Sequence, residues 1–368
     1  MSFAGRTMMI TKSLLVIALL TACSMASAEP YLAVLKGMQC STCHSHPSGG
    51  GKRTVYGNVF AQAELPAQRV GDPASAMWTG EVLDWLSVGA NLRGGYNYSD
   101  VPNVGSDSDF DITRGTVYVE AEILPNRLSL YVDQQIAPDE VENRELYLKL
   151  KTADSKFHVA AGQFFLPYGL RLQDDSAFIR QATGVNFILP DRGVQVGYES
   201  GPWSTQLSLT NGTGTGPVLE SSDQVSFVAN YVQPNWRAGV SFNSNNSSSG
   251  DRQMQNAFFG LKTGPVVWLG ELDFISDDLP GGSSQDALAG LIEGNWSYRK
   301  GHNLKVSYEY LDPDDDISED HQVRWSVLWE YTPMQFLQGR FGARLYDGIP
   351  QVDFQNRDEF FVEIHAFF

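Results

Sequence analysis

The sequence predicts an all-β protein, a transmembrane antiparallel β-barrel of about sixteen strands, with a small segment in front of it. Apolar and polar residues alternate along one short segment after another from about residue 85 onward, which indicates strands with one apolar face. The connections between these segments alternate between tight turns and longer polar loops. The chain also ends on an aromatic residue inside an alternating segment, as outer-membrane barrels generally do.

The composition agrees with a chain of many strands. Charged residues make up 19% of the 368 residues and aromatic residues 12%, and there are 35 glycines for turns. A net charge of −17 argues against nucleic acid as a partner, because a phosphate backbone needs a basic surface. Cations or cationic proteins are the expected partners. Only three cysteines occur, so the chain is no disulfide scaffold.

The first 28 residues have the pattern of a secretory signal peptide. Basic residues precede the apolar run 13–20, and Ala26-Ser27-Ala28 stands before Glu29, where the mature chain is expected to begin. A lipoprotein signal that ends at Cys23 is the alternative. No later stretch approaches the roughly 20 apolar residues of a membrane helix. We therefore expect export to the outer membrane of a Gram-negative bacterium.

The segment 29–80 contains a motif for covalent haem attachment. Cys40-Ser-Thr-Cys43-His44 is the C-x-x-C-H pattern of c-type haem. Two thiols three residues apart can reach the two vinyl groups on one porphyrin edge, and His44 is then aimed at the iron. The predicted cofactor is one covalent haem c, anchored by Cys40 and Cys43 and ligated by His44 on the proximal side.

Two other uses of this motif remain open. Cys40, Cys43, His44 and His46 could hold zinc in a tetrahedral site, since thiolate and imidazole are preferred zinc ligands. Cys40 and Cys43 could also form a simple disulfide.

The second axial ligand has three candidates. Met77 lies downstream in the linker, and a thioether would raise the reduction potential relative to a second histidine. His365 and His158 are both expected to point into the barrel near its periplasmic end. An open or water-bound site is the alternative, and each histidine could equally be a hydrogen-bonded residue of the barrel interior.

The segment 29–80 differs from the barrel region 81–368. Residues 56–62 read as a short helix, and Pro66, Gly71 and Pro73 mark a linker. So short a segment cannot bury much core by itself. We expect it to sit on the periplasmic side or inside the barrel as a plug, held by its haem and by contacts with the barrel.

The predicted strands follow from the alternation. They are 85–97, 113–124, 127–136, 144–152, 156–165, 192–200, 202–211, 223–233, 235–245, 252–263, 265–276, 286–299, 302–311, 321–332, 335–346 and 356–368. In the last strand, Phe360, Val362, Ile364, Ala366 and Phe368 should face lipid. The residues between them should face inward.

The short turns belong to the periplasmic end and the long loops to the outside. Three long loops are acidic, and each could attract a cationic electron donor or bind ordinary divalent ions. Their carboxylates are Asp107, Asp109 and Asp111 in one loop, Asp277, Asp278 and Asp286 in another, and Asp312, Asp314, Asp315, Asp316, Glu319 and Asp320 in the third. The stretch 166–192 could fold into the pore as a constriction or remain a surface excursion.

The whole layout resembles the fused monohaem cytochrome–porin family of the outer membrane, which includes iron oxidases. The resemblance rests on the signal peptide, on Gly37-Met38-x-Cys40-x-x-Cys43-His44 with Pro47 and Gly57 nearby, and on the barrel. Residues 162–169 also resemble a strand-to-loop passage of phosphate-selective-type porins. The run 48–57 departs from the family pattern, so only Cys40, Cys43 and His44 carry family roles over.

This resemblance implies a function. The haem segment would plug the barrel and pass electrons across the outer membrane, from an extracellular cationic donor such as Fe(II) to a periplasmic c-type cytochrome. The chain would be an electron-transfer protein rather than a conventional enzyme. The alternative is a solute-diffusion porin with a haem- or zinc-bearing N-terminal plug.

Overall fold

The computed structural model describes residues 29–368 except 73, 139–140, 186–189, 213–222, 248–249 and 279–280. The predicted signal peptide, with Cys23, lies outside the described residues, as does most of the loop that follows residue 212. Within the part that the structure describes, no helix is long and apolar enough to cross a membrane.

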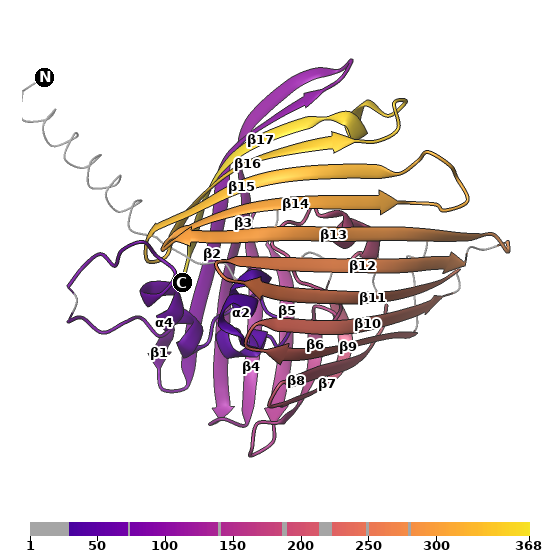
Figure 1. The fold of residues 1–368 in the computed structure, drawn as a ribbon. Helices are drawn as coiled ribbons and strands as arrows, with labels where there is room; N and C mark the ends of the chain where they lie inside the picture. Colours follow the sequence, from indigo (N-terminus) through magenta and orange to yellow (C-terminus); the bar gives the residue numbers. More distant parts are fainter. Residues whose placement is uncertain are drawn as a thin grey trace, which may run out of the picture.

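The strands β2 to β17 form one closed antiparallel barrel (Figure 1). Each strand pairs with the next along the chain, and β17 pairs with β2 to close the sheet. The barrel strands are β2 Leu86–Val101, β3 Gly105–Leu124, β4 Leu128–Ala137, β5 Glu142–Lys151, β6 Phe157–Phe164, β7 Asp191–Ser200, β8 Trp203–Thr210, β9 Asp223–Gln233, β10 Trp236–Ser247, β11 Gly250–Thr263, β12 Val266–Asp278, β13 Ser284–Arg299, β14 His302–Asp312, β15 Gln322–Met334, β16 Leu337–Asp347 and β17 Asp358–Phe367. The predicted fold class is confirmed, including the count of about sixteen strands.

The outer face of the barrel is apolar, as the alternation predicts. In β12, Val267 and Leu269 are buried toward the inside of the barrel, here called the lumen, while Trp268 between them is 41% exposed on the outside. In β17, Phe360, Ile364 and the residue midway between them are likewise exposed. Because successive side chains point to opposite faces of a strand, each strand places apolar residues on the outer surface and buried residues in the filled lumen.

The end of β17 departs from the prediction. Ala366 was expected on the lipid face, but it is buried in a small cluster with Ala90 and Phe367. Phe336, from the turn between β15 and β16, packs against the same cluster. The alternation rule therefore fails at the end of the strand, where residues of the segment 29–80 and of a neighbouring turn join one cluster with Ala366.

The connection 99–111 was predicted to be a loop, and this is wrong. β2 and β3 continue as a paired hairpin beyond the predicted strand ends, with Tyr98 opposite Ser108 and Val101 opposite Gly105. Serine and aspartate alternate there in place of apolar residues, so the sequence carries no burial signal. Backbone pairing holds these strands together, with a ring contact between Tyr96 and Phe110, whose side chain is 85% exposed.

The segment in front of the barrel contains three short helices and one short strand. They are α2 Pro30–Lys36, α3 Cys40–Cys43, α4 Val55–Ala63 and β1 Glu81–Leu83, which pairs with β2. The predicted helix at 56–62 is confirmed as α4. Figure 1 shows α2 and α4 at the end of the barrel where the C-terminus lies, which is the end with the short turns.

Residues 29–70, here called the plug, enter the lumen from the short-turn end. Tyr31 and Val34 of α2 are 3% and 1% exposed and belong to one apolar core with Phe258, Val267 and Leu269 of the barrel wall. The Tyr31 hydroxyl donates to Glu330 on β15 across 3.3 Å. The plug is therefore packed against the wall on its apolar face.

The stretch after β6 also folds into the lumen. Residues 165–185, here called the inward loop, include α5 Phe178–Thr183, which contacts β12, β13 and β14. Leu170, Leu172 and Ile179 of this loop share the apolar core of Val34. Of the two predicted arrangements for this stretch, the structure has the constriction and not the surface excursion.

Candidate functional site

The predicted haem-binding motif lies on α3, which is a single helical turn. Cys40 and Cys43 begin and end this turn, and the His44 amide closes it by donating to the Cys40 carbonyl at 3.0 Å. Both cysteines are free thiols. The Gln39 amide side chain, just before the turn, donates to the Pro202 carbonyl at 2.9 Å, which ties the motif to the β7–β8 turn.

A glycine-rich turn follows the motif and folds back on it. Gly49, Gly50 and Gly51 all have positive φ, a conformation that residues with a side chain rarely adopt. The reversal brings His44 and Arg53 into an antiparallel bridge. His44 is thereby held between two short segments of backbone and is 4% exposed.

The helix α4 packs directly on α3. Thr54 caps α4, since its hydroxyl accepts the Gly57 amide at 3.1 Å. The Thr54 amide in turn donates to the Cys43 carbonyl at 3.1 Å. Gly57 approaches the Cys43 backbone so closely that a Cβ there would overlap it. A glycine at 57 is therefore needed for the contact between the two helices.

Cys40, Cys43 and His44 line one cavity between the plug and the inward loop. Its walls enclose about 710 Å³ that no atom fills, part of it open to solvent. Most of the other lining residues are apolar or lack a side chain. They include Leu32, Ala33, Met38, Gly49, Gly50, Gly57, Phe60, Ala61 and Leu65, with Glu29, Lys36, Arg53 and Arg171 among the charged ones.

The site favours a neutral imidazole at His44. Burial, and next to it the charge of Arg53, lower the pKa of His44 to about 3. Its Nδ1 atom is buried and makes no hydrogen bond with the described residues. Burial also raises the pKa of Cys43 to about 11, with Cys40 adding to the shift. A neutral imidazole is the form that binds a metal.

These features fit a c-type haem. A porphyrin is a large flat apolar ring, and it needs apolar walls beside two thiols and one imidazole. Met38, Phe60 and Leu65 provide such walls in the cavity that both thiols and His44 line. The residues present therefore match the predicted group in chemistry, with two thiols, one imidazole and apolar neighbours.

The three predicted distal ligands are not among the described residues that line this cavity. His365 on β17 is fully buried and engaged at both ring nitrogens, with Asn91 at 3.1 Å and Gln338 at 3.3 Å. His158 lies on β6 with its ring against Gly197. Met77 is half-buried in the linker before β1. Met38, which sequence reasoning missed, is instead the methionine on the cavity wall.

The four predicted zinc ligands do not converge. His46 turns away from the cavity, with its Nδ1 atom 3.0 Å from Arg171 of the inward loop and its Nε2 atom 3.5 Å from Glu145. Among the described residues, the only group of three or more histidine, cysteine or acidic side chains close enough to share an ion lies in an outer loop. The plug is thus arranged differently from a preformed zinc site.

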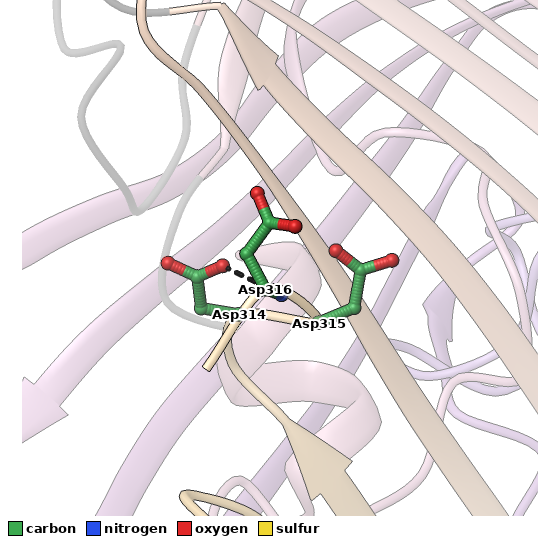
Figure 2. A group of neighbouring side chains, drawn as sticks. All are labelled: Asp314, Asp315 and Asp316. Atoms are coloured by element: carbon green, nitrogen blue, oxygen red, sulfur yellow. Dashed lines mark hydrogen bonds between the residues drawn. The ribbon is translucent and has the colours of Figure 1, made fainter. Parts of the chain in front are cut away.

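That outer-loop group consists of Asp314, Asp315 and Asp316 (Figure 2). One oxygen atom from each lies within 4.8 Å of the others, and Asp315 and Asp316 are exposed. The Asp316 amide donates to Asp314 at 3.2 Å. The group belongs to the third acidic loop predicted from the sequence, and its negative charge faces solvent at the long-loop end.

Ion pairs and hydrogen bonds attach the plug to the barrel wall. Lys52 of the plug and Lys149 of β5 both face the partly buried Glu120 carboxylate of β3, at 3.1 and 3.7 Å. Lys149 also donates to the Ser45 carbonyl at 2.7 Å, directly after the haem-binding motif. Within the motif, the Ser41 hydroxyl donates to Glu199 at 2.7 Å.

Sequence reasoning could have found only part of the cavity wall. Met38 stands beside Cys40 in the sequence, so its proximity to the motif was a usable signal. Phe60 and Leu65 lie on and after α4, at a distance along the chain that no local pattern connects to α3. Arg171 reaches the cavity only because the inward loop folds into the lumen.

The comparisons with known proteins match the fold alone. No family model and no curated protein matches the chain. Among solved structures, it is similar to outer-membrane-expressed OmpT of Vibrio cholerae (TM-score 0.58, 10% identity, 78% of this chain and 99% of that chain). It is also similar to an anion-selective porin from Comamonas acidovorans (0.59, 11%, 77% and 99%). A third is the outer membrane channel DcaP of Acinetobacter baumannii (0.56, 14%, 82% and 100%). By its fold, the chain is a porin-type β-barrel.

Proposed function

We propose that this protein is an outer-membrane electron conduit that carries electrons through one covalent haem c. The observation that carries the proposal is the position of Cys40, Cys43 and His44 on the wall of one largely apolar cavity. That cavity lies in a plug inside a porin-type barrel. When bound, a haem c supplies a reversible one-electron couple at its iron.

The protein's own residues would set the environment of that couple. Cys40 and Cys43 would anchor the group, and the neutral imidazole of His44 would bind iron. Apolar walls from Phe60 and Leu65 would exclude water, which controls the reduction potential together with the axial ligands. No acid, base or nucleophile is required of the chain.

The filled lumen supports electron transfer over solute diffusion. The plug and the inward loop meet in one apolar core, through Val34 and Leu170 among others. Solutes need a continuous water-filled path, whereas electrons can pass through packed protein. A lumen occupied by two packed segments favours the second kind of transport.

The charge distribution supports a direction of electron transfer and a class of electron-transfer partner. The Asp314–Asp316 group and the acidic residues around it face the long-loop end, where they would concentrate a cationic donor such as Fe(II). The cavity lies in the plug, toward the short-turn end, which we assign to the periplasm. A periplasmic c-type cytochrome would accept the electron there.

The test is a pyridine haemochrome spectrum, with haem staining after denaturing electrophoresis. Protein made together with the c-type maturation machinery is compared with the Cys40→Ala, Cys43→Ala double variant. Covalent haem in the parent and none in the variant is the expected result. Parent protein without covalent haem would refute the proposal.

A solute-diffusion porin is the second candidate, and the porins among the structural neighbours favour it. Single-channel conductance in planar bilayers separates the two functions. An electron conduit should give a barrel with little or no ion conductance. A large ohmic conductance in the haem-loaded protein would favour diffusion.

A further inference from the structure

Glu29 is buried against the inner side of the barrel wall. It is 5% exposed and stands directly before α2, which begins with Pro30. The sequence predicts that signal peptide cleavage occurs after Ala28, so the mature chain would carry its free α-amino group at Glu29. A terminus inside a barrel is unusual, since chain ends commonly lie at the surface.

A charged network surrounds Glu29. Its carboxylate lies 3.1 Å from the Lys305 ammonium of β14 and 3.9 Å from the Arg340 guanidinium of β16. Lys305 also faces Glu293 of β13 at 3.6 Å, and Arg340 faces Glu330 of β15 at 3.5 Å. We call Glu293, Lys305, Glu330 and Arg340, with Glu363 of β17, the socket.

The socket has more negative than positive charge. Arg340 also pairs with Glu363 at 2.7 Å, and the charge of Arg93 on β2 acts on Glu363 as well. Three cations, Lys305, Arg340 and Arg93, therefore face the four carboxylates of Glu29, Glu293, Glu330 and Glu363. One oxygen atom each of Glu29 and Glu330 is buried without a hydrogen-bond partner among the described residues, as is the Arg340 Nε atom that lies 3.5 Å from the Glu330 oxygen. Burial raises the pKa of Glu29 to about 7, although Lys305 opposes the shift. Buried carboxylates need cations close by.

We propose that the α-ammonium group of Glu29, created by signal peptide cleavage, is the missing cation of the socket and locks the plug in the lumen. The nitrogen belongs to the same residue as the Glu29 carboxylate, so it lies within a side chain's length of this network. A free α-amino group is protonated near neutral pH. It would supply a fourth positive charge and hydrogen bonds that a peptide nitrogen cannot.

The proposal makes docking of the plug depend on processing. Before cleavage, the nitrogen of Glu29 is a neutral amide joined to the preceding 28 residues. The socket would then lack this cation. Cleavage must therefore precede the final seating of the plug. This inference goes beyond the proposed function and holds with or without haem.

The first test measures the protection of the amine. Purified folded protein and protein unfolded in urea are treated with formaldehyde and cyanoborohydride near neutral pH, and modified peptides are counted by mass spectrometry. The Glu29 α-amine of the folded barrel should react at least about tenfold more slowly, since each unit of raised pKa removes about nine-tenths of the reactive free amine. The half-exposed Lys156 is the internal control and should react equally in both states.

Two results of this test would overturn the proposal. One is a mature N-terminus at a residue other than Glu29. The other is an α-amine that reacts as fast in the folded barrel as in urea.

The second test moves the α-ammonium group away from the socket. Two alanines inserted before Glu29, after the cleavage site, place the new α-ammonium outside the socket but leave the barrel sequence intact. We expect the plug of this variant to be cut by trypsin in its 36–69 region at least about tenfold faster, which corresponds to about 1.4 kcal/mol of lost docking. Heat-modifiable migration on gels confirms that the barrel has closed.

Substitutions in the socket complete the design. Glu330→Gln should speed both labelling and plug cleavage, while Glu330→Asp, which keeps the charge, should restore most of the protection. The matched control is Glu64→Gln, because Glu64 pairs with Lys36 at 3.0 Å at the exposed mouth and not in the socket. Equal effects of Glu330→Gln and Glu64→Gln, or an extension variant as resistant as the parent, would refute the lock.

Discussion

Gly57 and Cys43 are in backbone contact: a Cβ built at Gly57 would overlap the Cys43 carbonyl oxygen and lie 3.1 Å from the Cys43 Cα atom. This contact sets the distance between α4, which carries one wall of the cavity, and α3, which carries the thiols. The cavity therefore depends on a residue with no side chain.

Gly57→Ala should push α4 away from α3. Because the added methyl group meets backbone and not a flexible side chain, we expect a loss of about 1–3 kcal/mol in plug stability. The measurements are the haem-to-protein ratio after maturation and the rate of plug proteolysis. Val55→Ala, at an exposed position of the same helix, is the control and should leave both unchanged. A fully loaded, protease-resistant Gly57→Ala protein would contradict the expectation.

The two methionines near the motif should differ in their effect on the haem. Met38 lines the cavity and Met77 does not, so Met38→Leu should change the reduction potential and the visible spectrum more than Met77→Leu does. Leucine keeps the apolar volume and removes the sulfur, which a thioether ligand or a close contact would need. Redox titration followed by absorbance measures both effects. A larger shift in Met77→Leu would restore Met77 as the leading distal ligand.

Glu120→Ala should loosen the plug. The substitution leaves Lys52 and Lys149 buried without the carboxylate between them, and breaking such a pair costs about 3–5 kcal/mol. We expect higher single-channel conductance and faster proteolysis of the plug. Asp154→Ala removes an exposed pair with Lys156 and should have little effect. Unchanged conductance in Glu120→Ala would mean that other contacts hold the plug.

Neutralising Asp314, Asp315 and Asp316 should slow reduction of the haem by cationic donors and not by anionic donors. For the triple variant Asp314→Asn, Asp315→Asn, Asp316→Asn, we expect a lower rate of haem reduction with Fe(II) at low ionic strength and a smaller difference at high salt. Ferrocyanide, an anionic donor, should show no such loss. The matched control replaces Asp72, Asp84 and Asp154, at the short-turn end, with asparagine. An equal loss in both triple variants would show that only net charge matters.

The barrel could be predicted from the sequence almost strand by strand, because period-two alternation is a local signal. The prediction from alternation failed where one face of a strand is not buried, or where other segments cover it. In the hairpin formed by β2 and β3, no apolar face is buried near Ser108, so a regular strand looked like a loop. Ala366 is buried in a cluster with Ala61 and Ala90, which no pattern within β17 could indicate.

The candidate site could be predicted only at its motif. Cys40, Cys43 and His44 are adjacent in sequence, and their spacing reflects the shape of a porphyrin. Phe60 and Arg171 join them through tertiary packing, which spacing does not encode. The direction of the inward loop was undecidable for the same reason, since its apolar residues Leu170 and Ile179 could have covered either face of the wall.

The hydrogen bond between Tyr31 and Glu330 joins residues 299 positions apart in the chain. The plug is synthesised first, but the wall that receives it is completed by some of the last strands to emerge. Between these two events the segment must wait, accessible, in the compartment outside the inner membrane. An enzyme that modifies Cys40 or Cys43 has better access in that interval, because in the closed barrel the wall surrounds the plug and both thiols are half-buried. Assembly of the barrel would thus limit the time in which the plug can be modified.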